Sequence, residues 1–245
     1  MRHAVKRIVR QSIRRFGWDL RRIEHFGEPN LADFLRFQAI DLVLDVGANE
    51  GQFAIELREA GYSGDIMSFE PIASAYEKLA ANAARDPKWQ ACKVALGDRR
   101  SIAKIEITAL SVFSSMQPQA ERLRDWHPGT KIVGSERVEI VPLDSIVHPV
   151  PDRRIFLKVD TQGSEERILA GAQNVLSQAC GVQLELPVVH FYENVWSLTD
   201  AIAFMERAGF VIAQLRPVVY LPGTGSLGEI DCVFRRDHQK NPRHE

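Results

Sequence analysis

Short apolar runs alternate with amphipathic stretches along the chain from residue 41 onward. The apolar runs predict strands near residues 42–46, 65–69, 91–95, 155–160, 182–186, 210–215 and 230–235. Between them, apolar residues recur at helical spacing and predict helices near residues 52–60, 72–84, 164–177 and 198–208. Strands and helices that alternate in this way build a parallel sheet with helices on both faces.

The end of the chain departs from this alternation. Residues 217–228 join the last two predicted strands and leave no room for a crossover helix. Two strands joined this closely pair antiparallel. The pattern therefore predicts an α/β, Rossmann-like, doubly wound sheet with an antiparallel end hairpin, which differs from the six-stranded dinucleotide-binding fold.

A basic amphipathic segment precedes the sheet. Its apolar positions recur at helical spacing with arginines between them: Val5, Val9, Ile13, Phe16, Leu20 and Ile23. Residues 1–24 carry eight Lys or Arg against two acidic residues, a net charge of +6. Such a helix either caps the domain or a partner subunit, or rests on an anionic membrane surface. We expect an N-terminal helical extension over residues 1–35, a single domain over 36–236 and a polar tail over 237–245.

One segment inside the domain lacks the regular spacing of apolar residues that marks the predicted strands and helices. Alternating residues at 104–109 and 137–141 predict two further short strands. The residues between them, 110–136, are polar and weakly periodic. Long excursions of this kind in α/β domains are often lids or substrate loops.

Composition narrows the class of protein. The 245 residues carry a net charge of −1, and no RNA-binding signature is apparent, so we expect no nucleic-acid partner. The three cysteines are widely separated and suggest neither a disulfide framework nor a zinc site. No apolar run reaches the roughly 18 residues of a transmembrane helix. We expect a cytoplasmic protein, peripheral to the inner face of the membrane if the basic extension binds lipid.

The first motif that indicates ligand binding is the turn that follows the first predicted strand. It contains Asp45, Gly47, Ala48, Asn49 and Gly51. Glycines allow a cofactor to approach the backbone, as in adenosine-binding folds. A carboxylate before the turn repels a pyrophosphate but attracts a sulfonium or ammonium group. The spacing therefore favours S-adenosylmethionine over NAD.

Two acids near later strand ends are further candidate cofactor contacts. Glu70 ends the second predicted strand and is followed by Pro71, which stops the strand. A carboxylate at this position can accept both hydroxyl hydrogens of a ribose. Asp98 follows the third strand, where it either binds the adenine amino group or caps a turn.

The second motif runs from Phe156 to Glu165. Strand alternation places Lys158 and Asp160 on the same side of a buried strand, before a glycine turn that opens a helix. In open α/β sheets, ligands bind beyond the carboxyl ends of the strands. We expect Asp160 to lie in that crevice, although capping of the next helix is the structural alternative.

The following strand adds candidate acid and base residues. Glu185 and His190 would face the same crevice, and a histidine there is a plausible general base near neutral pH. His127, in the long loop, is a weaker candidate. No tight spacing of His, Cys, Asp or Glu demands a metal site.

Together these motifs resemble the FkbM family of S-adenosylmethionine-dependent methyltransferases. The resemblance covers roughly residues 40–235 and is carried by LDVGANEGQF, FEP, ALGD, VPLDS, LKVDTQGSEERILAGA, QLELP and AGF. It implies a class I methyltransferase sheet of seven strands and O-methylation of a sugar or polyketide-like hydroxyl. It also implies cofactor contacts at Asp45, Gly47, Asn49, Gly51 and Glu70, and a signature near the methyl donor and acceptor at Asp160, Gln162, Gly163 and Glu165.

The expected reaction is transfer of the sulfonium methyl group to an acceptor hydroxyl of a glycan or other small molecule. His190 or Asp160 would take the hydroxyl proton, and Glu185 would orient the acceptor. The alternatives are an NAD-dependent oxidoreductase and a non-catalytic adenosine-binding scaffold. Assembly into a homo-oligomer also remains open at this stage.

Overall fold

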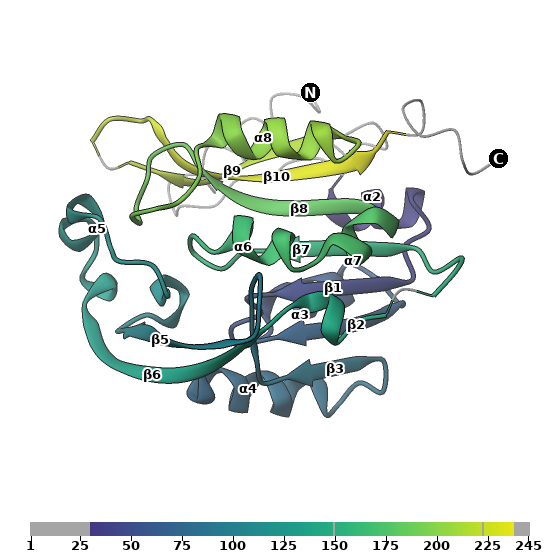
Figure 1. Cartoon of the computed structure of the whole chain (residues 1–245), viewed down its shortest axis with the longest axis horizontal. Coiled ribbons are helices and arrows are strands. Elements are labelled where there is room, and N and C mark those ends of the chain that lie inside the picture. Colours follow the sequence, from purple (N-terminus) through teal and green to yellow (C-terminus); the bar gives the residue numbers. More distant parts are fainter. Residues whose placement is uncertain (1–29, 149, 222, 238–245) are drawn as a thin grey trace, which may run out of the picture.

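The computed structural model describes residues 30–148, 150–221 and 223–237. The basic segment at residues 1–24 and most of the polar tail lie outside this range. The central feature is a seven-stranded sheet in the order β3-β2-β1-β7-β8-β10-β9 (Figure 1). Its strands are β1 (Leu42–Val46), β2 (Asp65–Phe69), β3 (Trp89–Cys92), β7 (Ile155–Val159), β8 (Ala179–Pro187), β9 (Phe210–Tyr220) and β10 (Leu227–Arg236).

Helices cover both faces of this sheet because its inner strands are apolar on both sides. One face packs against α2 (Leu31–Phe37), α3 (Gln52–Glu59) and α4 (Ala73–Ala83). The opposite face packs against α6 (Glu165–Ala170), α7 (Gln173–Gln178) and α8 (Leu198–Arg207). Alternation in β7 sends Leu157 to the α6–α8 face and Phe156 to the α2–α4 face. Lys158 shares the α2–α4 face with Phe156, which matters for the site below.

The sheet has the predicted end hairpin. Strand β10 pairs antiparallel with both β8 and β9, whereas β1, β2, β3, β7 and β8 run parallel. The predicted α/β class I methyltransferase architecture is thereby confirmed. The expected boundary between residues 35 and 36 falls inside α2, whose Phe34 and Leu35 are buried in the domain core.

A smaller sheet lies beside the carboxyl ends of the main strands. It has the order β4-β6-β5 and consists of β4 (Ala95–Leu96), β5 (Ser101–Thr108) and β6 (Ile132–Val141). The connection from β5 to β6 contains a 3-10 turn (Ser111–Phe113), α5 (Glu121–Trp126) and a second 3-10 turn (Pro128–Thr130). Figure 1 shows β5, β6 and α5 at one end of the main sheet.

Three element predictions were wrong in detail. The helix expected over 164–177 is divided into α6 and α7 at Gly171. The strand expected over 91–95 is interrupted after Cys92, because β4 joins the smaller sheet instead of the main one. The strand expected at 137–141 begins at Ile132, so part of the expected loop is β6. In each case a tertiary contact sets a boundary that local periodicity does not reveal.

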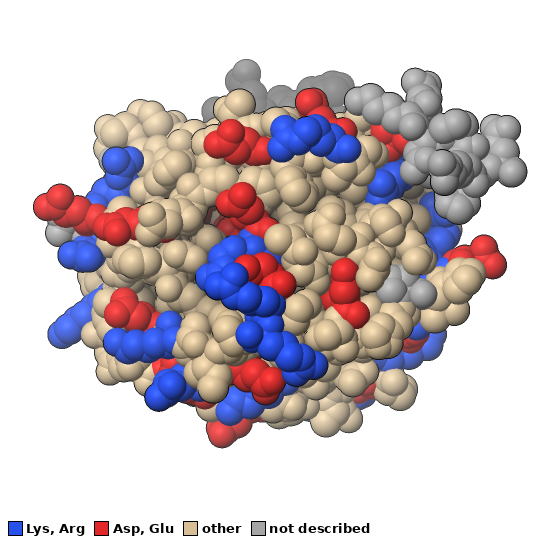
Figure 2. All heavy atoms as spheres, viewed as in Figure 1, with Lys and Arg blue, Asp and Glu red and all other residues tan. Residues whose placement is uncertain are grey.

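Surface charge on the described residues is mixed. On the face that carries α6, α7 and α8, basic and acidic side chains are interspersed (Figure 2). Several of them form ion pairs, such as Arg167 with Asp98 at 3.0 Å. Within the described ranges, every helix is too short or too polar to traverse a bilayer.

Candidate active site

A cavity of about 490 Å³ lies at the carboxyl ends of the main strands. Its walls include the turn after β1, the end of β2 and the segment that follows β7. The 3-10 turn Ser111–Phe113 closes another side, and the Oγ of Ser111 donates a hydrogen bond to Asn49 Oδ1 at 3.0 Å. The volume falls in the range of small-molecule and cofactor sites.

The turn after β1 is shaped by Gly47. Its φ is +76°, and a Cβ added there would lie 1.8 Å from the backbone oxygen of Asp160. Only glycine therefore lets the β1 turn and the segment after β7 approach this closely. The amide of Asp160 donates to the carbonyl of Val46 at 3.1 Å, which ties the two segments together. The cavity floor depends on this contact.

Glu70 presents its carboxyl group at the end of β2. One oxygen accepts the amide N–H of Asn49 at 2.9 Å, and the other accepts that of Ile72 at 2.8 Å. Burial raises the pKa of Glu70 to about 7, although these two amides favour its ionised form. The side chain is 5% exposed and lines the cavity. It is thus held in one orientation, with lone pairs left for ligand hydroxyl groups.

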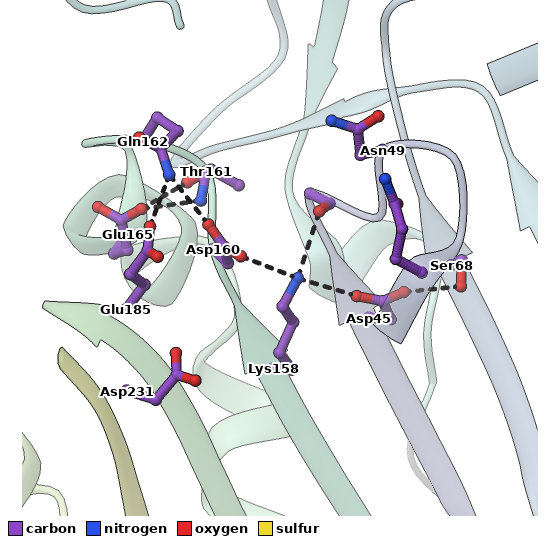
Figure 3. A network of polar contacts seen from close by, with 12 residues as sticks. Asp45, Asn49, Ser68, Lys158, Asp160, Thr161, Gln162, Glu165, Glu185 and Asp231 are labelled. Atoms are coloured by element: carbon purple, nitrogen blue, oxygen red, sulfur yellow. Dashed lines mark hydrogen bonds and ion pairs between the residues drawn. The ribbon is translucent and has the colours of Figure 1, made fainter. Parts of the chain in front are cut away.

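Lys158 joins the two sides of the site. Its Nζ lies 3.2 Å from Asp45 Oδ1 and 3.3 Å from Asp160 Oδ2 (Figure 3). The other oxygen of Asp45 accepts a hydrogen bond from Ser68 Oγ at 3.0 Å. Asp45 is fully buried and does not line the cavity. Its charge is therefore used to hold Lys158, and through Lys158 to position Asp160, which does face the cavity.

Asp160, Gln162 and Glu185 form the second half of the network. The amide Nε2 of Gln162 lies 3.3 Å from Asp160 Oδ1 and 2.5 Å from Glu185 Oε2. Burial opposes ionisation of Asp160, but Lys158 and the hydrogen bonds from Glu185 and Gln162 hold its pKa below the usual range. Burial and the charge of Asp160 raise the pKa of Glu185 well above its usual range. The pair therefore holds a proton more readily on Glu185 than on Asp160.

Side chains on β8, β9 and β10 extend the cavity wall beyond Glu185. They are Gln183, Arg216, Val218, Val219, Glu229 and Asp231. The five on β9 and β10 were not among the site residues predicted from the sequence. The signal that could have found them is strand alternation, because Glu229 and Asp231 lie two residues apart on one strand. Their position beside Glu185 depends on strand register, which a sequence pattern does not give.

The structure brings most of the predicted site residues to the cavity. Lining it are Gly47, Ala48, Asn49, Glu70, Pro71, Asp160, Gln162 and Glu185. Gly51 lies behind the turn, where an added Cβ would be 2.8 Å from the ring of Trp89. Its role is to let α3 begin against that ring.

Besides Asp45 and Gly51, two more predicted residues lie outside the cavity lining. Asp98 is outside the lining and accepts hydrogen bonds from Arg167, which lower its pKa. His190 is exposed and also lies outside the lining, because β8 ends at Pro187 and strand alternation does not continue to residue 190. The structure therefore places Asp160 and Glu185 together, but not His190 with them.

Two aromatic side chains that follow β8, Tyr192 and Trp196, lie outside the lining of the main cavity. Tyr192 is buried and donates its hydroxyl hydrogen to the carbonyl of Phe113 at 3.0 Å. Trp196 packs edge-on against Phe204. The aromatic rings that do line the main cavity belong to Phe53, Phe69 and Phe113.

The donor set suits an adenosine cofactor. An oriented carboxylate at the end of β2 matches a ribose diol, and the adjoining wall is apolar, with Ile72, Leu96 and Ile168. Across residues 30–148, 150–221 and 223–237, no three His, Cys, Asp or Glu side chains are grouped so as to hold a metal ion.

Comparisons with known proteins identify the family. The Methyltransferase FkbM domain matches residues 45–212. No protein of curated function matches the sequence. Among solved structures, TehB from Haemophilus influenzae aligns with a TM-score of 0.48 at 8% identity, over 87% of this chain and 64% of TehB. The chain thus spans less than two thirds of the length of TehB.

Two further solved structures are similar over most of their length. Magnesium protoporphyrin IX methyltransferase from Synechocystis PCC 6803, with bound SAM, aligns with a TM-score of 0.45 at 15% identity, over 95% of this chain and 97% of that enzyme. An rRNA methylase from Streptococcus thermophilus aligns with a TM-score of 0.47 at 12% identity, over 87% and 99% of the two chains.

The family match covers both motifs that build the cavity, from Asp45 in β1 to Phe210 at the start of β9. It decides between the activities left open by the sequence, in favour of methyl transfer and against hydride transfer or a non-catalytic scaffold. The chain belongs to the FkbM methyltransferase family and uses S-adenosyl-L-methionine as its methyl donor.

Proposed function

We propose that this methyltransferase acts on oxygen, at a hydroxyl group of a sugar or a similar polyol. The observation that carries the proposal is the Asp160–Glu185 carboxyl pair, which faces the cavity beyond the carboxyl end of β7. The pKa of Asp160 is lowered and that of Glu185 is raised, so Asp160 is the member suited to receive a proton and Glu185 the member suited to donate a hydrogen bond.

Asp160 is suited to accept the hydroxyl proton. A carboxylate is too weak a base to deprotonate a free alcohol. When an alcohol is methylated, however, its oxygen becomes the strongly acidic oxygen of a protonated ether, and a carboxylate then removes the proton readily. S-adenosylmethionine supplies the electrophilic methyl group, so the protein needs to align the acceptor and receive this proton.

The neighbours of Asp160 act as positioning residues. Lys158 is buried and contacts the carboxylates of Asp45 and Asp160, which keeps Asp160 ionised and fixed. Gln162, held at a φ of +57°, bridges Asp160 and Glu185 through its side-chain amide. Burial and the charge of Asp160 raise the pKa of Glu185, which favours its protonated form, and this form can donate a hydrogen bond to an acceptor oxygen.

A polyol acceptor fits the mixed lining beyond this pair. Hydroxyl groups require hydrogen-bonding partners, and Gln183, Glu185 and Asp231 supply them from neighbouring strands. Apolar surfaces of Phe53 and Val218 lie in the same cavity, as the carbon face of a sugar ring requires. The glycan acceptor expected from the sequence is thus supported by both kinds of contact.

The test is methyl transfer from radiolabelled S-adenosylmethionine to a panel of sugars and oligosaccharides, followed by identification of the methylated atom. We expect a methyl ether. Asp160→Asn should lower turnover by about 100-fold or more, within the range typical of general-base removal. Affinity for S-adenosylhomocysteine should change by only a few-fold.

Glu206→Gln serves as the matched control, because Glu206 is an exposed acid on α8, away from the cavity. This variant should retain wild-type turnover. Label found on nitrogen or on a carboxylate rather than on a hydroxyl oxygen would refute O-methylation. Full turnover in Asp160→Asn would refute the role given to Asp160.

A further inference from the structure

A row of ionisable side chains crosses the strands of the acceptor side. Glu185 on β8 is directly opposite Asp231 on β10, and Asp231 is directly opposite Arg216 on β9. Residues directly opposite on neighbouring strands share one face of the sheet. Glu229 lies two residues before Asp231 and therefore projects from the same face. All four side chains line the cavity.

Acidic side chains outnumber basic ones in this region. Four acids line this side, namely Asp160, Glu185, Glu229 and Asp231, against two cations. Lys158 pairs with Asp160, and also with Asp45 beneath the cavity. Arg216 pairs with Asp231 at 2.7 Å. Neither cation contacts Glu185 or Glu229.

The carboxyl groups of Glu185 and Glu229 differ in their hydrogen-bond partners. Glu185 accepts the hydrogen bond from Gln162. The carboxyl group of Glu229 makes no hydrogen bond or ion pair with any of the described residues. Burial, and then the charge of Asp160, raise the pKa of Glu229 to about 8. Glu229 is half-buried and lines the cavity, so its carboxyl group is within reach of a bound ligand.

We propose that the acceptor is an amino sugar or amino polyol, whose protonated amine binds the carboxylate of Glu229 while a hydroxyl group of the same molecule meets Asp160. This assignment rests on the O-methylation proposed above and adds the group that determines specificity. A nearby ammonium group favours the ionised form of Glu229, and its three donors match the resulting carboxylate.

The same geometry disfavours anionic acceptors. A phosphate or carboxylate placed here would lie among four acids, with both cations already paired. Like charges at short range in a buried site repel strongly. A neutral sugar would escape this repulsion but would leave Glu229 without a cation.

The experiment compares a glucosamine oligosaccharide, whose amines are protonated, with its N-acetylated counterpart, whose amides are uncharged. Binding of each to the full-length protein is measured by calorimetry in the presence of S-adenosylhomocysteine. We expect the free amine to bind more tightly by about tenfold, the scale of one charge-assisted hydrogen bond. Glu229→Gln should abolish this preference, whereas Glu206→Gln should preserve it. Thermal unfolding of each variant confirms that it is folded.

Equal or undetectable binding of the two oligosaccharides would overturn the assignment, as would a preference that survives in Glu229→Gln. Analysis of the methylated atom separates this outcome from the proposed function. Methyl ethers formed without any preference for the amine would leave O-methylation standing and remove the amine. A preference for the amine with label only on nitrogen would keep the role of Glu229 and refute O-methylation.

Discussion

The two ends of the cavity are built in different ways. At the cofactor end, Gly47 and the amides of Asn49 and Ile72 shape the turn and orient Glu70, so backbone atoms do most of the positioning. At the acceptor end, the groups are side chains from β7, β8, β9 and β10. Backbone positioning depends on a short continuous motif, whereas side-chain positioning depends on how distant strands pair.

This difference determines which substitutions each end is expected to tolerate. The turn after β1 at the cofactor end tolerates few substitutions, because its shape depends on φ angles and close contacts. A set of side chains on paired strands can be replaced one at a time without altering the sheet. The structure therefore combines a fixed site for a common cofactor with a wall whose chemistry can be adapted to a particular acceptor.

The cofactor end should be the more sensitive to a single methyl group. Gly47→Ala places a Cβ 1.8 Å from the carbonyl oxygen of Asp160, so the β1 turn must move. We expect affinity for S-adenosylhomocysteine to fall by about 100-fold or more, since small displacements in a preorganised site are costly. Calorimetry measures this loss.

Gly61→Ala is the matched control for that substitution. Gly61 has a φ of +90°, but an added Cβ would have no atom within 4 Å. It should lose about 1–2 kcal/mol of stability from backbone strain and keep its affinity for the cofactor product. Equal losses of affinity in the two variants would show that strain, not the contact with Asp160, determines the effect of Gly47→Ala.

Replacing Lys158, which contacts carboxylates at both ends of the cavity, should lower the stability of the protein. Lys158→Met leaves Asp45 and Asp160 without their cation, and Asp45 is fully buried. Breaking a buried ion pair costs about 3–5 kcal/mol. Urea denaturation should show this decrease in the free energy of unfolding, and Asp45→Asn in the same chain should restore part of it. A loss below about 1 kcal/mol would mean that the ion pairs do not hold the site together.

The smallest expected effect is on the pH dependence of stability. The pKa values of Glu70 and Glu229 are raised to about 7 and about 8 by burial, from an ordinary value of 4.5. Between pH 4.5 and 8 the unfolded chain releases these protons while the folded chain retains them. The free energy of unfolding should therefore fall as pH rises, on the order of 1 kcal/mol per pH unit for each group.

Glu229→Gln should reduce that slope, most clearly between pH 7 and 8, where Glu70 has already titrated in the folded protein. Denaturation curves for the variant and the wild-type protein at several pH values provide the comparison. Identical slopes would indicate that Glu229 is ionised in the folded protein at neutral pH.

The sequence predicted the cofactor end more completely than the acceptor end, for a physical reason. The β1 turn, the strand that ends at Glu70 and the segment around Asp160 are each local patterns of about ten residues. Their convergence follows from the rule that parallel strands carry ligands at their carboxyl ends. Asp45 was found by the same pattern, but its burial beneath Lys158 required the packed structure.

The acceptor end depends on contacts that sequence spacing does not encode. Arg216, Glu229 and Asp231 become neighbours of Glu185 only through the register of β8, β10 and β9. His190 was expected in the crevice because alternation was extended beyond Pro187, where the strand in fact ends. Asp98 was expected near adenine, but Arg167 on α6 holds its side chain.

The main inference is that the cofactor binds at one end of the cavity and the acceptor at the other. A crystal structure of the protein with S-adenosylhomocysteine would test it most directly. The account predicts that both ribose hydroxyl groups donate hydrogen bonds to Glu70 and that the sulfur atom faces Asp160. It also predicts that Glu185 and Glu229 remain free of the cofactor product. A ribose placed away from Glu70, or a homocysteine group bound to Glu229, would contradict this account.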